Sequence, residues 1–147
     1  MRFRDGDTIV SPKCTGPLFY VEFDAQSLRL GVGVKEFSPQ TLSVYRTIVG
    51  SDMRGIVYAL NLAVKQAKEQ GDEIIGPLLS RLPRGYEGSS HPELLKRKGF
   101  FVHRETPLPE AIHSPGFVDY CAEWFKSRAA VFDALRKVAL TSLTNGS

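Results

Sequence analysis

The alternation of apolar and polar positions predicts a β-hairpin over residues 18–34. Two runs rich in aromatic and aliphatic residues are joined by the short, turn-prone segment Asp24-Ala25-Gln26, as is typical of antiparallel neighbours. Leucines and valines share one face of the second run, and the other face contains Gly31 and Gly33. Two glycines on one face of a strand indicate that something packs very close to it. A covering helix is favoured over a bound ligand.

Apolar positions at helical spacing predict helices near 39–49, 53–70, 91–98 and 115–140. Ser-Pro pairs at 38–39 and 114–115 give two of these helices an N-cap followed by proline at the first helical position. Ser90 and Glu93 form a Ser-x-x-Glu capping box at the start of the third helix. Gly71 is expected to end the second helix.

The order of the elements predicts an α+β fold. Short apolar runs at 74–75 and 100–104 add two strands to the hairpin. We therefore expect a mostly antiparallel sheet covered by helices, with a long C-terminal helix, in a single domain of residues 1–147. Within it, residues 1–16 are predicted to be a loop-rich N-terminal segment and residues 141–147 a flexible tail.

Composition narrows the class of protein. The chain has 147 residues, of which 42% are hydrophobic and 24% charged, as in ordinary globular domains. No apolar run approaches the roughly 18 to 20 residues of a membrane span. The N-terminus lacks the apolar core of a signal peptide, so we expect a cytoplasmic protein without a membrane partner. A net charge of +3 without a concentrated basic stripe disfavours nucleic acid as a partner.

The chain carries none of the common catalytic or cofactor motifs. A Gly-x-Ser-x-Gly elbow and a Walker motif are absent, and Gly31-Val32-Gly33 lies inside a predicted strand without the third glycine of a dinucleotide loop. Cys14 and Cys121 fit no metal-ligand spacing, and neither do the three histidines. Asp5 and Asp7 fit surface turns better than a metal site. No cofactor and no metal are predicted.

A cluster of cations is the remaining candidate site. Arg84 lies in a Pro-Arg-Gly turn, and His91 stands at the start of the predicted 91–98 helix, where free N–H groups and the helix dipole attract anions. The helix also contains Lys96 and Lys98. These four residues predict a site for a small anionic ligand, a phosphate or a carboxylate. A solvated basic face, whose lysine stems cover apolar surface, is the simpler interpretation, and both stay open.

Two further function classes also stay open. The first is an enzyme that acts on a phosphorylated or nucleotide-like substrate, with His91 as the catalytic acid or base near neutral pH. The second is a protein-interaction or regulatory module, in which the cations dock an acidic partner. A ligand site requires Arg84 and His91 to converge, and we predict that their side chains approach one another. A flat, exposed face would favour docking.

The same region carries a family resemblance. The segments Leu-Pro-Arg-Gly-Tyr at 82–86 and His-Pro-Glu-Leu-Leu-Lys-Arg-Lys-Gly-Phe at 91–100 resemble the signature of the bacterial and fungal family known as domain of unknown function 2461. The aromatic strand and the Gly-x-Gly strand of the predicted hairpin are similar to that family as well. The resemblance covers about residues 17–140. It implies an α+β fold and no particular activity.

The resemblance also bears on the N-terminal segment. Family members carry an additional N-terminal helical region, which is missing here, and then a basic segment to which residues 2–13 are similar in a shortened form. The resemblance thus implies that Arg4 and Lys13 contribute to the anion site. Without the helical region, apolar surface of the sheet would be exposed, so we expect a homodimer or a complex with another protein. The long C-terminal helix is the alternative cover.

Overall fold

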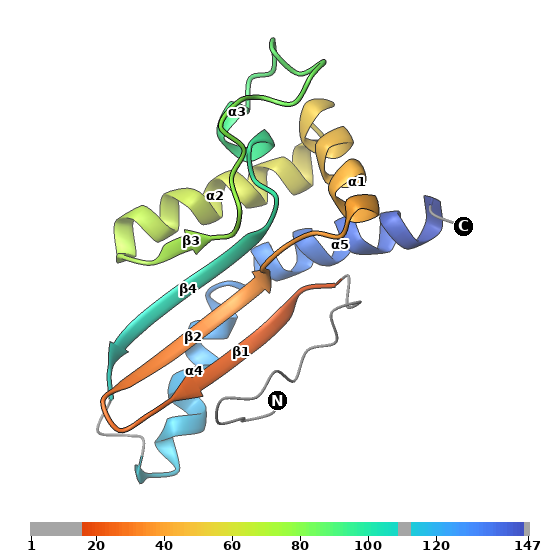
Figure 1. Ribbon diagram of the computed structural model, residues 1–147. Coiled ribbons are helices and arrows are strands. Elements are labelled where there is room, and N and C mark those ends of the chain that lie inside the picture. The colour runs from red at the N-terminus through yellow and green to blue at the C-terminus, as the bar shows by residue number, and fades with distance from the viewer. Residues whose placement is uncertain (1–15, 109–112, 146–147) are drawn as a thin grey trace.

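The computed structural model describes residues 16–108 and 113–145, which form a four-stranded antiparallel sheet and five helices (Figure 1). The sheet order is β1-β2-β4-β3. Its strands are β1 Leu18–Phe23, β2 Ser27–Val34, β3 Glu73–Ile75 and β4 Phe100–Pro107. The helices are α1 Pro39–Gly50, α2 Arg54–Gln70, α3 Pro92–Leu95, α4 Gly116–Lys126 and α5 Ala129–Asn145. The predicted α+β fold is confirmed.

The β1–β2 hairpin forms where it was predicted, but the group that packs against its two glycines is the neighbouring strand β4 and not a helix. The ring of Phe101, on β4, lies so close to Gly31 that an added Cβ would be 2.2 Å from the ring Cζ. At Gly33, where φ is +132°, a Cβ would be 2.1 Å from the carbonyl oxygen of Phe100. The neighbouring strand therefore fills the space that the glycines leave, and this corrects the favoured expectation.

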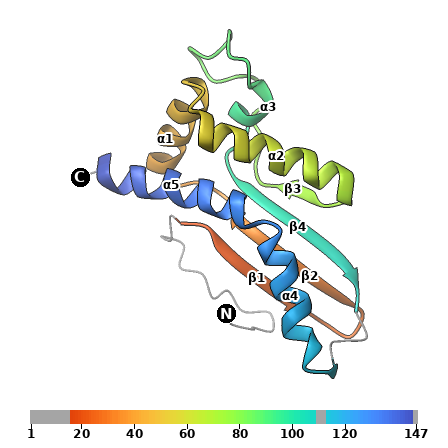
Figure 2. The ribbon, with the colours of Figure 1, turned by 180° about the vertical axis from the view of Figure 1, so that it is seen from behind.

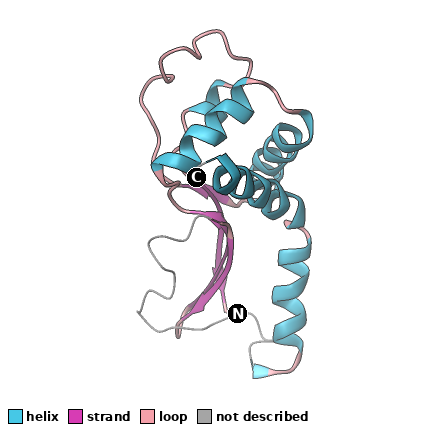
Figure 3. Cartoon of the chain, turned by 90° about the vertical axis from the view of Figure 1, so that its right-hand side faces the viewer, coloured by secondary structure: helices cyan, strands magenta, loops and turns pink. Residues whose placement is uncertain are grey.

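Helices cover one face of the sheet. α4 and α5 lie behind the sheet in Figure 1 and in front of it in Figure 2, and Figure 3 shows the sheet edge-on with α4 along one side. The Phe19 ring of β1 points to this side, with its centroid 4.7 Å from Phe125 of α4 and 4.4 Å from Phe132 of α5. Residues that alternate with Phe19, such as Tyr20, belong to the opposite face.

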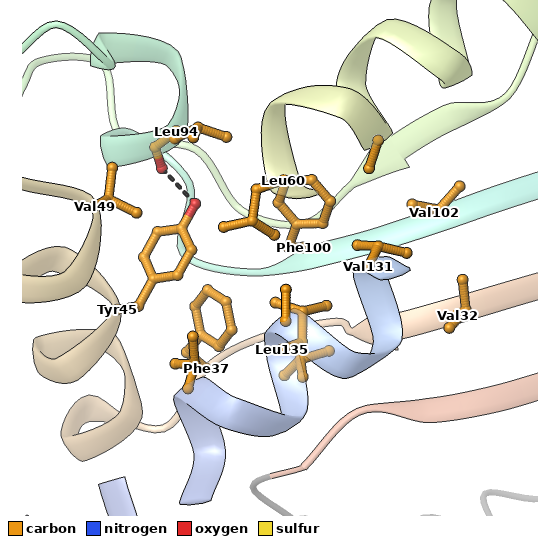
Figure 4. Close-up of a cluster of buried hydrophobic side chains, with 14 of the residues drawn as sticks. Val32, Phe37, Tyr45, Val49, Leu60, Leu94, Phe100, Val102, Val131 and Leu135 are labelled. Atoms are coloured by element: carbon orange, nitrogen blue, oxygen red, sulfur yellow. Dashed lines mark hydrogen bonds between the residues drawn. The ribbon is translucent and has the colours of Figure 1, made fainter. Parts of the chain in front are cut away.

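The core lies between this sheet face and the helices (Figure 4). Tyr45 of α1 is at its centre, with 0% of its surface exposed. Its hydroxyl donates to the carbonyl oxygen of Leu94 at 2.8 Å, which satisfies a polar group that would be costly to bury alone. Burial raises the pKa of Tyr45 well above its ordinary range. This bond ties α1 to α3.

Two of the residues predicted to begin or end a helix do so. Ser38 caps α1 by accepting a hydrogen bond from the Thr41 amide at 3.2 Å, and Gly71 ends α2 in the left-handed conformation. The single helix predicted over 115–140 is instead divided into α4 and α5 at Ser127 and Arg128, and α5 continues to Asn145.

The division has a local cause. The Ser127 hydroxyl donates to the Trp124 carbonyl oxygen at 2.6 Å, and the Arg128 amide bonds to the Phe125 carbonyl at 3.0 Å, an i→i−3 contact that tightens the last turn of α4. Across the described ranges, no helix is long and apolar enough to span a membrane.

Candidate functional site

The cations predicted to form a site lie mainly on one long loop that is fixed to the sheet. The Leu79 amide bonds to the Lys96 carbonyl, the Lys98 amide to the Pro77 carbonyl, and the Phe37 amide to the Lys98 carbonyl, each at 2.8 Å. These bonds extend the β2-β4-β3 order beyond the regular strands, so the backbone positions of Lys96 and Lys98 are held in place. We call residues 77–99 the basic loop; it stands at the top of Figure 1.

The predicted 91–98 helix is much shorter than expected. α3 has four residues, Pro92–Leu95, because the backbone groups of Lys96 and Lys98 pair with the 77–79 segment instead of continuing the helix. The predicted capping box is also wrong: His91 is the N-cap residue, without a side-chain cap, and its amide donates to Ser89 Oγ at 3.1 Å. A helix of one turn supplies little dipole, so any attraction of an anion must come from the side chains.

His91 is held by two residues that the sequence did not connect with it. Its Nε2 lies 2.7 Å from Asp52 Oδ1, and its Nδ1 lies 3.5 Å from Asn61 Nδ2. This pattern fits the tautomer in which Nε2–H donates to Asp52 while Nδ1 accepts a weak bond from Asn61. The His91 side chain is 18% exposed and that of Asp52 63% exposed. The pair therefore sits at the protein surface with the histidine on its inner side.

Asp52 occupies an unusual position between α1 and α2. Its φ is +55°, the left-handed region that few residues other than glycine adopt and that Asp and Asn tolerate best. Asn61 lies on α2. In the sequence, Asp52 is recognisable only as a turn residue between two predicted helices. No spacing rule links it to His91, which follows 39 residues later.

The other predicted site residues are placed separately. Arg84 is exposed, and within residues 16–108 and 113–145 it forms no hydrogen bond or ion pair. The side chains of Lys96 and Lys98 are partly exposed and likewise have no such partner in the described part of the chain. The approach of Arg84 to His91 stays a prediction. Arg4 and Lys13 lie outside the described residues.

A second polar network lies on the sheet face opposite α4 and α5. Glu22 accepts hydrogen bonds from the Tyr20 hydroxyl at 2.8 Å and from Arg29 Nε at 2.6 Å, and both bonds lower the pKa of Glu22. Burial, with a smaller effect from Glu22, raises the pKa of Tyr20 to about 12. The Lys35 ammonium lies 4.8 Å from the centre of the Tyr20 ring. These groups satisfy one another, so the network holds β1 and β2 together.

The candidate metal ligands and the cysteines are placed as follows in the part of the chain that the structure describes. That part of the chain contains no group of three or more His, Cys, Asp or Glu side chains placed to hold a metal ion. Cys121 is a free, buried thiol, and burial raises its pKa, so its reactive thiolate form is disfavoured. Cys14, Asp5 and Asp7 lie outside the described residues.

Comparison with known proteins gives one match. The family model described as "Conserved hypothetical protein (DUF2461)" matches residues 8–133, a range that includes the hairpin and the whole basic loop. No curated protein and no solved structure matches the chain.

Proposed function

The chain belongs to the family described as conserved hypothetical protein (DUF2461), and we propose that it is an anion-binding domain whose site is the basic loop. One observation carries this proposal. Arginines of the sheet and of α5 are paired with carboxylates, as Arg29 is with Glu22 and Arg136 with Asp133. The exposed or partly exposed arginines and lysines of the basic loop have no carboxylate partner in the described ranges: Arg81, Arg84, Lys96, Arg97 and Lys98.

Unpaired cations on an anchored loop favour a bound anion. The hydrogen bonds at the base of the basic loop and the His91–Asp52 contact limit how far the loop can move, so little conformational entropy is lost on binding. Arginine and lysine form strong, charge-assisted hydrogen bonds to phosphate and carboxylate oxygens. A phosphate group, free or attached to a small molecule, fits several cations better than a single carboxylate does.

His91 supplies a further polar contact of the proposed site. The imidazole already holds a carboxylate oxygen of Asp52, so its position suits an oxyanion. An anion in the basic loop would share or take over this hydrogen bond. Asp52 thus acts as an internal competitor, and its charge weakens the binding of phosphate.

A thermal-shift titration with inorganic phosphate tests the proposal. At a phosphate concentration near 100 Kd, the free energy of unfolding should rise by about 2.7 kcal/mol. The Arg84→Ala variant should abolish this gain. Arg136→Ala, which removes an arginine of α5 paired with Asp133, is the matched control and should keep it. An equal gain in Arg84→Ala and His91→Ala would place the anion elsewhere.

The His91–Asp52 pair also favours a second candidate function, an enzyme of the phosphorylated or nucleotide-like substrate class. A carboxylate that orients an imidazole is a frequent arrangement for a general acid or base. Turnover of nucleotides and phosphate monoesters, measured for the unmodified protein and for His91→Ala, tests this candidate. Activity that His91→Ala retains would exclude His91 as the acid or base.

A homodimer or a protein complex stays a prediction. Large apolar side chains on the helical side support it: Tyr58 is 69% exposed, Met53 50% and Leu143 62%. Light scattering distinguishes the states, since one chain has a mass of 16.3 kDa. A mass of one chain at micromolar concentration, together with no protein recovered in a pull-down, would contradict the prediction.

A further inference from the structure

A groove of about 280 Å³ lies between α2 and the start of α5, away from the basic loop. Part of its lining is apolar and comes from Ala59, Leu62 and Val131; the polar part includes Lys65 and Arg128. A concave, mostly apolar surface with a few polar groups is the usual form of a small-molecule site. The volume of this groove is slightly below the roughly 300 to 1,000 Å³ typical of such sites, so it would suit only a small ligand.

Arg128, which lines the groove, belongs to a cluster that has one positive charge in excess. Asp72, whose side chain is fully buried, accepts hydrogen bonds from Arg104 Nε at 2.6 Å and from an NH2 group of Arg128. Gln70 Oε1 also accepts from Arg128, at 2.8 Å. Two guanidinium groups thus share one carboxylate. Only 2% of the Arg128 side chain is exposed, and its buried Nε has no hydrogen-bond partner among the described residues.

The start of α5 adds a second attraction for an anion. The first i→i−4 bond of this helix runs from the Phe132 amide to the Arg128 carbonyl at 3.2 Å, so the amides of residues 129–131 precede the hydrogen-bonded ladder. The first turn of α5 contains no acidic residue. Ala130 and Val131 both line the groove, which places the positive end of a 17-residue helix beside Arg128.

We propose that this groove binds a small monocarboxylate with a short apolar body. The carboxylate would balance the single excess charge of the cluster to which Arg128 belongs and accept from the α5 amides, while the apolar body would contact Ala59, Leu62 and Val131. The charge of Glu69, which also lines the groove, disfavours a phosphate dianion. The site is separate from the basic loop and from the function proposed for it.

An NMR titration of the full chain with hexanoate tests the proposal, with hexanol as the uncharged probe and inorganic phosphate as the dianion. Hexanoate should shift the amide signals of residues 129–131 in a saturable way, and hexanol should leave them unchanged. Equal shifts with hexanol would overturn the recognition of a carboxylate. Larger shifts at these amides with phosphate than with hexanoate would overturn the monocarboxylate assignment.

Two neighbouring lysines of α2 give a matched pair of variants. Lys65 lines the groove, whereas Lys68 is exposed and is not part of the lining. Lys65→Ala should weaken hexanoate binding about two- to fivefold, as expected for one partly solvated charge. Lys68→Ala should leave the affinity unchanged, and Glu69→Gln should increase it. Equal effects of Lys65→Ala and Lys68→Ala, or a loss with Glu69→Gln, would overturn the proposal.

One further variant separates this site from the basic loop. Arg84→Ala should abolish the response to phosphate and leave the response to hexanoate intact. If Arg84→Ala removes the hexanoate shifts, the carboxylate binds at the basic loop and the groove proposal fails, while the anion-binding function stands.

Discussion

The imidazole Nε2 of His91 lies 2.7 Å from Asp52 Oδ1, and this contact joins the basic loop to the turn between α1 and α2. Because the Asp52 side chain is 63% exposed, solvent screens the pair, and the contact stabilises the fold only weakly. The contact matters mainly for the binding of an anion. The carboxylate of Asp52 already accepts a hydrogen bond from the histidine that the proposed anion site needs.

Asp52→Asn should therefore increase the affinity for inorganic phosphate by about two- to fivefold, the effect of removing one solvent-screened charge. Asparagine tolerates the left-handed backbone of position 52 as well as aspartate does, so the turn should be preserved. Isothermal titration calorimetry measures the change. Asp133→Asn on α5 makes the same change in net charge and should have little effect. Weaker binding by Asp52→Asn would contradict the role of Asp52 as a competitor.

Gly31→Ala should lower the free energy of unfolding by about 1 to 3 kcal/mol, the usual cost of inserting a group into a packed region. An added Cβ would meet the Phe101 ring at 2.2 Å. Urea denaturation measures the change. Gly55→Ala, where nothing lies within 4 Å of an added Cβ, is the control and should be neutral or stabilising. Equal stability of Gly31→Ala and the unmodified protein would show that the Phe101 ring can pack there without a glycine at position 31.

Asp72→Asn should destabilise the protein more than Gly31→Ala does. The free energy of unfolding should fall by about 3 to 5 kcal/mol, because the substitution leaves buried positive charge without its carboxylate. The Asp72 side chain is fully buried and contacts both Arg104 and Arg128. Thermal or urea unfolding gives the value, and Asp119→Asn on α4 is an exposed control. A loss below about 1 kcal/mol, the size of a screened surface pair, would mean that solvent reaches this cluster.

Glu22 should make stability depend on pH in the acid range. Hydrogen bonds from Tyr20 and then Arg29 lower its pKa in the folded protein below the ordinary value of about 4.3. The stabilisation is therefore complete above about pH 4.3 and is lost as the pH falls through the lower, folded-state pKa. Urea unfolding between pH 2 and pH 6 should show a shallower loss in Glu22→Gln than in the unmodified protein. If the free energy of unfolding fell equally with pH in both proteins, Glu22 would not be a source of the acid-range pH dependence.

The fold was easier to predict than the site because it depends on local patterns. Alternation fixed the hairpin, and Ser38 and Gly71 marked the ends of helices through their own backbone geometry. One error arose where a distant segment decides the outcome: the 91–98 helix is cut short by pairing with residues 77–79. The other arose because the local hydrogen bonds at Ser127 and Arg128, which interrupt the helix over 115–140, leave no mark in the spacing of apolar residues.

The candidate site could be predicted only in part, because some of its contacts come from distant segments of the chain. Arg84, Lys96 and Lys98 could be found as cations close together in sequence, because charge density is a local property. Asp52 could not, since only the packing of the basic loop against the α1–α2 turn brings it to His91. The glycines of β2 were read correctly as a close approach, but the approaching group, Phe101, lies 70 residues after Gly31 and carries no local signal.

A phosphate titration followed by NMR of the backbone amides reports where the anion binds as well as whether it binds. The amides of the basic loop, residues 77–99, should shift together with a single Kd, and Arg84→Ala should abolish these shifts. Saturable shifts confined to other parts of the chain, or shifts of the basic loop that persist unchanged in Arg84→Ala, would contradict the proposed anion site.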